Sequence, residues 1–191
     1  IIFNVLEGSG FWAGIGPKIR NIGILGSKTA GTNQIGIKVD ASPYLRSVEV
    51  SSVRIINCGS HGLYVGKVFS SRFVDIFSSD HNGYPFLIDG DQQPSNHFES
   101  LYAGDVNTGF LSGFRIRKGN VTLVSCNGIN SSPSGSWWAT VGDATSLESD
   151  GLSGDYTATL NLLNCNIESS RAGGIRSYGN SRINFLGENF F

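Results

Sequence analysis

The sequence predicts an all-β protein, a right-handed single-stranded parallel β-helix with about 22–24 residues per coil. Three observations predict this solenoid. Short strand patterns recur along the chain, and helical periodicity is nearly absent. Glycine is abundant, with 26 glycines in 191 residues. A period in the low twenties with two or three short strands per coil and no helix is typical of a β-solenoid.

The clearest repeat is residues 53–66, which combine a strand, a polar corner and a second short strand. Residues 160–179 repeat this arrangement with a longer corner. Period-two alternation with one buried face predicts that aligned strands place apolar residues in one column. At spacings of 21, 24, 23, 39 and 23 residues, that column is Val53, Val74, Phe98, Val121, Leu160 and Ile183.

The organisation is expected to be one β-helix domain over residues 1–191. We expect less regular first coils with strands at residues 21–26, 36–40 and 44–50, and a loop insertion between coils at residues 127–156. The chain has no Met and starts with Ile1, which predicts a fragment of a longer protein.

Composition and charge restrict the partners. A formal net charge of -1 gives no electrostatic reason to expect nucleic acid. No apolar run approaches the roughly 20 residues that cross a bilayer, so we expect no membrane insertion. Three cysteines without a short pairing motif argue against a disulfide framework or a zinc site, and we expect no metal and no cofactor. In the alignment all three fall in one column of small, buried, reduced corner residues: Cys58, Cys126 and Cys165.

The repeat pattern, the glycine-rich corners and the asparagine corner positions resemble the pectate-lyase-like β-helix superfamily. The likeness is to the β-helical domains of bacteriophage tailspikes and related polysaccharide depolymerases, and it spans residues 22–191. The resemblance implies a homotrimer in the virion tail. It also implies a bacterial cell-surface polysaccharide, capsule or O-antigen, as the partner.

A polar column between the apolar ones supplies the first candidate site. The alignment puts Asp75 and Glu99 on adjacent coils, about 4.8 Å apart, with Arg54 beside Asp75. Paired carboxylates at a short separation are the acid and base of glycosidases. The same residues equally fit a solvated face on which opposite charges stabilise the register.

A second candidate is the adjacent pair Asp80 and His81, because an acid beside an imidazole can share a proton. Asp89 and Asp91 follow after the next strand. The segment Ser-Ser-Asp-His-Asn-Gly is also typical of an ordinary polar turn.

Other residues are candidates for holding the substrate. His61 and Tyr64 lie in the repeat at residues 53–66, and Ser60-His61-Gly62 matches one fragment of the polygalacturonase motifs without the carboxylates that family requires. Trp137 and Trp138 lie in the predicted insertion, where a ring could stack on a sugar or pack on the column or on a neighbouring subunit. The insertion also contains four carboxylates: Asp143, Glu148, Asp150 and Asp155.

Three functions follow as hypotheses. The first is a tailspike-type receptor-binding protein that recognises and cleaves polysaccharide, with Asp75, Glu99 and Asp80 catalytic and Arg54, His61, Tyr64, His81, Trp137 and Trp138 binding the glycan. The second is a non-catalytic structural module of a trimeric viral fibre. The third is a secreted polysaccharide lyase or epimerase, for which the only basic cluster is Arg115, Arg117 and Lys118.

Overall fold

The computed structural model describes residues 2–3, 16–29, 33–40, 45–90, 95–105, 112–129, 136–142, 158–168 and 173–190. These segments are mostly β-strand and contain no α-helix. The expectation of an all-β fold is therefore confirmed. The strands form long parallel sheets, an arrangement consistent with a solenoid.

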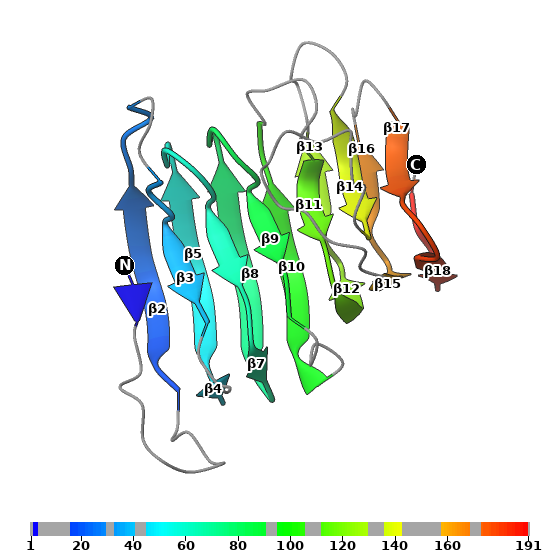
Figure 1. The fold of residues 1–191 in the computed structure, drawn as a ribbon, viewed down its shortest axis with the longest axis horizontal. Helices are drawn as coiled ribbons and strands as arrows, with labels where there is room; N and C mark the ends of the chain where they lie inside the picture. The colour runs from blue at the N-terminus through cyan, green and yellow to red at the C-terminus, as the bar shows by residue number, and fades with distance from the viewer. Residues whose placement is uncertain are drawn as a thin grey trace.

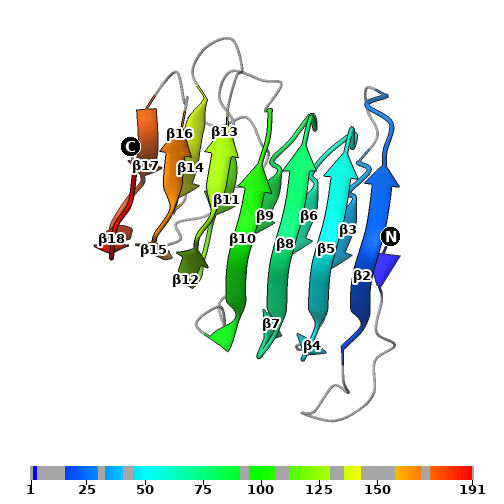
Figure 2. The ribbon, with the colours of Figure 1, turned by 180° about the vertical axis from the view of Figure 1, so that it is seen from behind.

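Two large sheets contain most of the strands (Figures 1 and 2). Sheet A follows the order β1 (Ile2–Phe3), β3 (Ile37–Val39), β6 (Leu63–Val65), β9 (Phe86–Ile88), β11 (Ser112–Ile116), β14 (Trp137–Val141) and β17 (Gly173–Ser177). Sheet C follows the order β2 (Lys18–Leu25), β5 (Glu49–Ile56), β8 (Arg72–Ser79), β10 (His97–Ala103), β12 (Gly119–Val124), β15 (Ala158–Leu163) and β18 (Arg182–Leu186). Two further strands of sheet C, β13 (Asn127–Ile129) and β16 (Asn166–Glu168), pair with each other, and β13 also pairs with β10. Sheet B contains only β4 (Leu45–Arg46) and β7 (Val68–Phe69).

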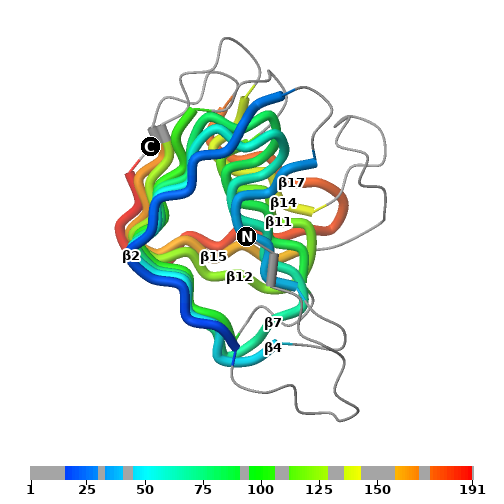
Figure 3. The backbone as a smooth tube through the Cα atoms, turned by 90° about the vertical axis from the view of Figure 1, so that its left-hand side faces the viewer, coloured from blue at the N-terminus to red at the C-terminus, as the bar shows by residue number. Residues whose placement is uncertain are grey.

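Successive repeats of the chain stack in sequence order, each pairing through its strands with the repeat before and the repeat after it. Strand β5 pairs in parallel with β2 and β8, and β8 pairs in parallel with β10. In the end-on view of Figure 3 the traces of successive repeats overlie one another. Each residue therefore lies in a column with its counterparts in the repeats before and after it.

The core fills the space between the two sheets with apolar columns. Val50, Phe73 and Phe98 occupy one column of sheet C, and the Phe73 and Phe98 rings stack with centroids 5.1 Å apart. In sheet A, Phe86 stacks on Phe114 in the same way at 5.0 Å. These four aromatic rings and Val50 are at most 1% exposed, so each repeat buries its apolar side chains mainly against its neighbours.

One column of sheet C has left-handed backbone dihedral angles. A single residue of this kind redirects an extended chain, and short polar residues and glycine tolerate it best. The φ angles lie between 50° and 71° at seven residues that share this column: Asn21, Ser52, Asp75, Ser100, Ser125, Asn164 and Gly187. The inward positions on either side of the bend are three residues apart, as with Val50 and Val53.

This bend changes the register that strict alternation predicts. Val53 pairs with Ile76 rather than with Val74, and Phe98 pairs with Leu123 rather than with Val121. Alternation with period two fits equally well after a slip of two residues, and the bend column adds one residue that breaks the period. The predicted pairings of Leu160 with Val121 and with Ile183 are confirmed.

The prediction that all three cysteines share one column is also wrong. Cys126 and Cys165 precede the paired residues Asn127 and Asn166, so these two cysteines share a column. The residue 23 positions after Cys58 is His81, whose Nδ1 accepts the Cys58 backbone N–H at 3.0 Å. All three cysteines are nevertheless buried and free, as expected.

Candidate functional site

The outer face of sheet A gathers polar side chains from successive repeats. The middle residue of each short strand points away from the core because its two neighbours point into it. This outward column contains Lys38, Tyr64, Leu87, Arg115, Thr140 and Arg176. Leu87, Arg115 and Thr140 are buried, whereas Lys38 and Tyr64 at one end and Arg176 at the other are partly exposed.

Tyr64 belongs to a cluster that spans four repeats. Its hydroxyl donates to Oδ2 of Asp89 at 3.4 Å, and the same oxygen accepts from Nη1 of Arg117 at 2.7 Å. Asp89 and Arg117 have side chains only 11% and 6% exposed. The buried ion pair therefore lies beneath Tyr64 and fixes the direction of its hydroxyl. We call Lys38, Asp40, Tyr64, Asp89 and Arg117 the Tyr64 cluster.

The charges of the Tyr64 cluster balance within the chain. Burial raises the pKa of Asp89, and the positive charges of Arg117 and Lys118 oppose that rise. Burial, together with Asp89, raises the pKa of Tyr64, so its hydroxyl keeps its proton. Lys38 lies 5.2 Å from the Tyr64 ring centre and 3.9 Å from Oδ2 of Asp40. A fixed hydroxyl, an ammonium group and a carboxylate on a partly exposed surface can hydrogen-bond a polyhydroxylated ligand.

The predicted carboxylate pair is not brought together. Asp75 lies in the bend column with φ of 55°, and its counterparts in the adjacent repeats are Ser52 and Ser100. Glu99 pairs with Val74 instead. The expectation that Asp75 and Glu99 are direct neighbours was therefore wrong, because the predicted alignment of these two strands differs by one residue from the observed pairing. Their catalytic roles remain predictions.

Glu99 and Asp80 each bind a cation of this chain. Nε2 of His97 lies 2.8 Å from Oε2 of Glu99, and this hydrogen bond lowers the pKa of Glu99, with Arg72 adding to the effect from 3.9 Å. Asp80 forms an ion pair with Lys28. The pKa of Glu99 is thus lowered, whereas a general acid needs a raised one. Asp91, the other acid of that region, lies outside the described residues.

Arg54 and His61 each lie against an aromatic ring. The exposed Arg54 places its guanidinium 4.8 Å from the centre of the Phe77 ring, which stacks on Tyr102 at 5.1 Å. Nδ1 of His61 accepts the backbone N–H of Tyr84 at 3.0 Å, and the two rings stack. These contacts hold both side chains in place, and their predicted roles in binding a glycan remain predictions.

His81 is fully buried, which does not fit direct contact with a substrate. Its Nδ1 accepts the Cys58 backbone N–H, so in the neutral ring the proton is on Nε2, which donates to Oγ of Ser78 at 3.0 Å. Ser78 in turn donates to the carbonyl of Pro85 at 2.9 Å. His81 therefore cannot take a proton from Ser78. The two side chains form structural hydrogen bonds and do not act as a nucleophile and its base.

The two tryptophans lie on strand β14 instead of a loop. Trp138 is 1% exposed and packs on Phe114 with centroids 4.7 Å apart, so its predicted place on a glycan-binding loop is wrong. Trp137 is partly exposed and lies within contact of Arg176. Residues 130–135 and 143–156 of the predicted insertion, with its four carboxylates, lie outside the described residues.

Sequence reasoning did not place Asp89 and Arg117 with Tyr64. The signal was present in the second strand of each repeat. Asp89 follows Ile88 and Arg117 follows Ile116 directly at the ends of paired strands. Aligning these short apolar strands, as well as the longer ones, would have put both charges in one column.

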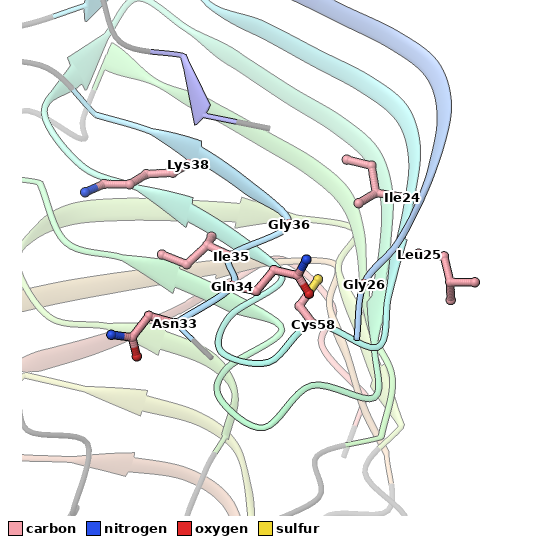
Figure 4. A pocket seen from close by; sticks show the side chains of 9 residues that line it. All are labelled: Ile24, Leu25, Gly26, Asn33, Gln34, Ile35, Gly36, Lys38 and Cys58. Carbon is pink, nitrogen blue, oxygen red and sulfur yellow. The ribbon is translucent and has the colours of Figure 1, made fainter. Parts of the chain in front are cut away.

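A pocket of about 490 Å³ lies near the first strands, at the end of the column that includes β2 (Figure 4). A Cβ on Gly26 would lie 2.8 Å from Cα of Cys58 and 3.0 Å from Oε1 of Gln34, so both residues lie against Gly26, while the Leu25 side chain points away from them (Figure 4). Its lining residues are Ile24, Leu25, Gly26, Asn33, Gln34, Ile35, Gly36, Lys38 and Cys58. Among the described residues this lining is mainly apolar and includes no carboxylate, so they supply no acid–base pair for sugar cleavage.

The described residues contain no group of three or more His, Cys, Asp or Glu side chains that could hold a metal ion. None of the described segments forms a helix long and apolar enough to cross a membrane.

This protein therefore belongs to the all-β class. Its parallel sheets are stacked, and one of them carries a polar cluster on its outer face. No family model matches the chain, and neither a curated protein nor a solved structure matches it.

Proposed function

We propose that this chain is the β-helical part of a tailspike-type receptor-binding protein that recognises a polysaccharide on the bacterial surface. The stacked parallel sheets support a β-helix. We propose a right-handed coil, because crossover connections between parallel strands of one sheet are right-handed in about 98% of cases. The same proposal places the chain in a homotrimer in the virion tail, with a secreted enzyme as the alternative setting.

The observation that carries the proposal is the Tyr64 cluster. Its hydroxyl, ammonium and carboxylate groups share one partly exposed patch, and a buried ion pair beneath holds the tyrosine in place. Sugar hydroxyls both donate and accept, and such a mixed set of groups satisfies both roles. A site built on strands is also held more precisely than a site on loops.

The proposal concerns recognition first. Cleavage needs an acid and a base at a suitable separation, and Asp75 and Glu99 lie in different columns. The lyase alternative would need exposed basic groups. However, Arg115 donates to the backbone carbonyl of Gly142 and Arg117 binds Asp89, and both arginines are buried.

A binding experiment tests the proposal. The intact chain is mixed with purified capsular polysaccharides and O-antigen lipopolysaccharides, and retained protein is measured by co-sedimentation. Tyr64→Phe removes the hydroxyl and should weaken binding at least about fivefold, the effect of losing one to two hydrogen bonds. Tyr102→Phe is the matched control on sheet C and should bind like the wild type. Failure of every polysaccharide to retain the protein would overturn the proposal.

A structural module of a trimeric fibre is the second candidate, and the internal pairing of the cluster charges favours it. This module would form trimers, measured by mass in solution, without retaining any polysaccharide. Product analysis separates the enzymatic readings. New reducing ends indicate a hydrolase, and an absorbance rise from unsaturated sugars indicates a lyase.

A further inference from the structure

The outer face of sheet A ends in a second cluster, which is separate from the Tyr64 cluster. Arg176 on β17 is the last residue of the outward column and pairs with Thr140 of β14. Its guanidinium carbon lies 5.5 Å from the centre of the Trp137 ring and 4.8 Å from the centre of the Tyr178 ring. All three of these side chains are partly exposed.

Arg176 differs from the arginines that the chain uses for ion pairs. Arg117 binds Asp89, Arg20 binds Glu49, and Arg72 lies 3.9 Å from Glu99. Within the described part of the chain, Arg176 has aromatic contacts and no carboxylate. A guanidinium held between two rings is oriented but keeps its hydrogen-bond donors for an outside acceptor.

The backbone holds the rings of this cluster in position. A Cβ on Gly173 would lie 2.4 Å from Cζ3 of Trp137, so the Trp137 ring rests directly on the backbone of the next strand. Gly173 has φ of 151°, a conformation that L side chains rarely adopt, so no other residue fits here without strain. The backbone N–H of Tyr178 donates to the carbonyl of Val141 at 2.8 Å.

We propose that Trp137, Arg176 and Tyr178 form a binding site for an acidic sugar residue whose carboxylate binds Arg176. This inference rests on the proposed function and adds the chemical class of the glycan. The planar guanidinium matches a carboxylate with two parallel hydrogen bonds. The Trp137 ring offers an apolar surface on which the C–H face of a pyranose ring can stack. The site therefore selects a carboxylated polysaccharide over a neutral one.

The test uses the intact chain and two probes that differ only at the carboxyl group of each sugar. Oligosaccharides of glucuronic acid carry the carboxylate, and their methyl esters have the same rings without the charge. Binding is measured by calorimetry for the wild type, Arg176→Gln, Arg176→Lys and Arg20→Gln. Arg20→Gln is the matched control, because it also removes one exposed arginine, on sheet C, where Arg20 binds Glu49. Circular dichroism checks that each variant is folded.

We expect the acid to bind at least about tenfold more tightly than its ester, the effect of one charge-assisted contact. Arg176→Gln should remove this preference, Arg176→Lys should reduce it because a lysine lacks the planar fork, and Arg20→Gln should keep it. Equal binding of acid and ester, or an unchanged preference in Arg176→Gln, would overturn the inference.

Binding to the bacterial polysaccharides distinguishes a failure of the acidic-sugar site from a failure of the proposed function. If a neutral polysaccharide binds the wild type and Arg176→Gln equally well, the proposed function stands and the acidic-sugar site is wrong. If no polysaccharide and no oligosaccharide binds, the proposed function is wrong, and the inference that rests on it is wrong too.

Discussion

His81, in the repeat that follows Cys58, accepts a hydrogen bond from the Cys58 backbone that only a neutral imidazole ring can accept. The Nδ1 lone pair receives the Cys58 backbone N–H at 3.0 Å, and the opposite ring nitrogen donates to Ser78. Burial lowers the pKa of His81 to about 4, with His61 and Lys28 adding to the effect and Asp80 opposing it. Protonation would remove this acceptor.

The first prediction is a loss of stability on acidification. The folded-state pKa of His81 lies below the ordinary value of 6.5, so between pH 6.5 and about 4 the unfolded chain binds more protons. The stabilisation is complete above pH 6.5 and decreases as the pH falls, by about 1.4 kcal/mol per pH unit at most. Urea unfolding at pH 7.5, 6, 5 and 4.5 measures it.

His81→Gln provides the control for that prediction. We expect it to be less stable at pH 7.5 by about 1–3 kcal/mol, since it disturbs two buried hydrogen bonds. Its free energy of unfolding should change less between pH 6.5 and 4.5 than that of the wild type. Parallel pH curves for the two proteins would contradict the role of His81.

The second prediction concerns the bend at Asp75. A β-branched residue is poorly accommodated at φ of 55°, so Asp75→Val should destabilise the fold by about 1–2 kcal/mol. Asp75→Gly should leave stability within about 0.5 kcal/mol of the wild type, because glycine adopts this conformation readily. Urea unfolding measures both. Arg72→Val, at an exposed position of the same strand without positive φ, is the control, and an equal loss in Asp75→Val and Arg72→Val would contradict the prediction.

The third prediction concerns the buried ion pair beneath Tyr64. Arg117→Met leaves the Asp89 carboxylate buried without its cation and should cost about 3–5 kcal/mol. The double variant Asp89→Leu with Arg117→Met should recover part of that loss, since no charge remains buried. A double-mutant cycle from chemical unfolding measures the coupling. Additive single losses would show that the two side chains are independent.

The fourth prediction separates the adjacent tryptophans. Trp138→Ala should cost about 3–5 kcal/mol because it empties a core position beside Phe114. Trp137→Ala should cost about 1 kcal/mol or less, because this side chain is partly exposed. Thermal unfolding followed by far-ultraviolet circular dichroism compares them. The opposite ranking would contradict their placement on β14.

The repeat architecture was predictable because each repeat carries its own apolar pattern. The strands at residues 53–56 and 160–163 lie within the observed β5 and β15, and the spacing of 39 residues across residues 121–160 matches the observed pairing. What simple alternation could not supply was the bend. Ser52 and Asp75 look like ordinary polar strand residues, yet each adds one position that interrupts the period of two.

The candidate site was less predictable because it depends on the register between repeats. Tyr64 was identified from the sequence, but Asp89 and Arg117 reach it only through the pairings of three short strands. Arg176 meets Trp137 and Tyr178 through the last pairing of sheet A. A slip of two residues in any of these pairings would separate the groups. The sequence therefore predicts which residues are candidates better than it predicts which of them lie together.

The bend column makes the repeat a unit of insertion and deletion. Ser52 and Asp75 occupy equivalent positions 23 residues apart, so excising residues 53–75 joins Ser52 to Ile76, the residue that normally pairs with Val53. Such an excision shortens the protein by one repeat and leaves the remaining repeats aligned. Removing a single residue within a strand would instead shift the side chains of that strand against those of its neighbours. Evolution can therefore lengthen or shorten this protein in whole repeats while the columns of the remaining repeats stay in register.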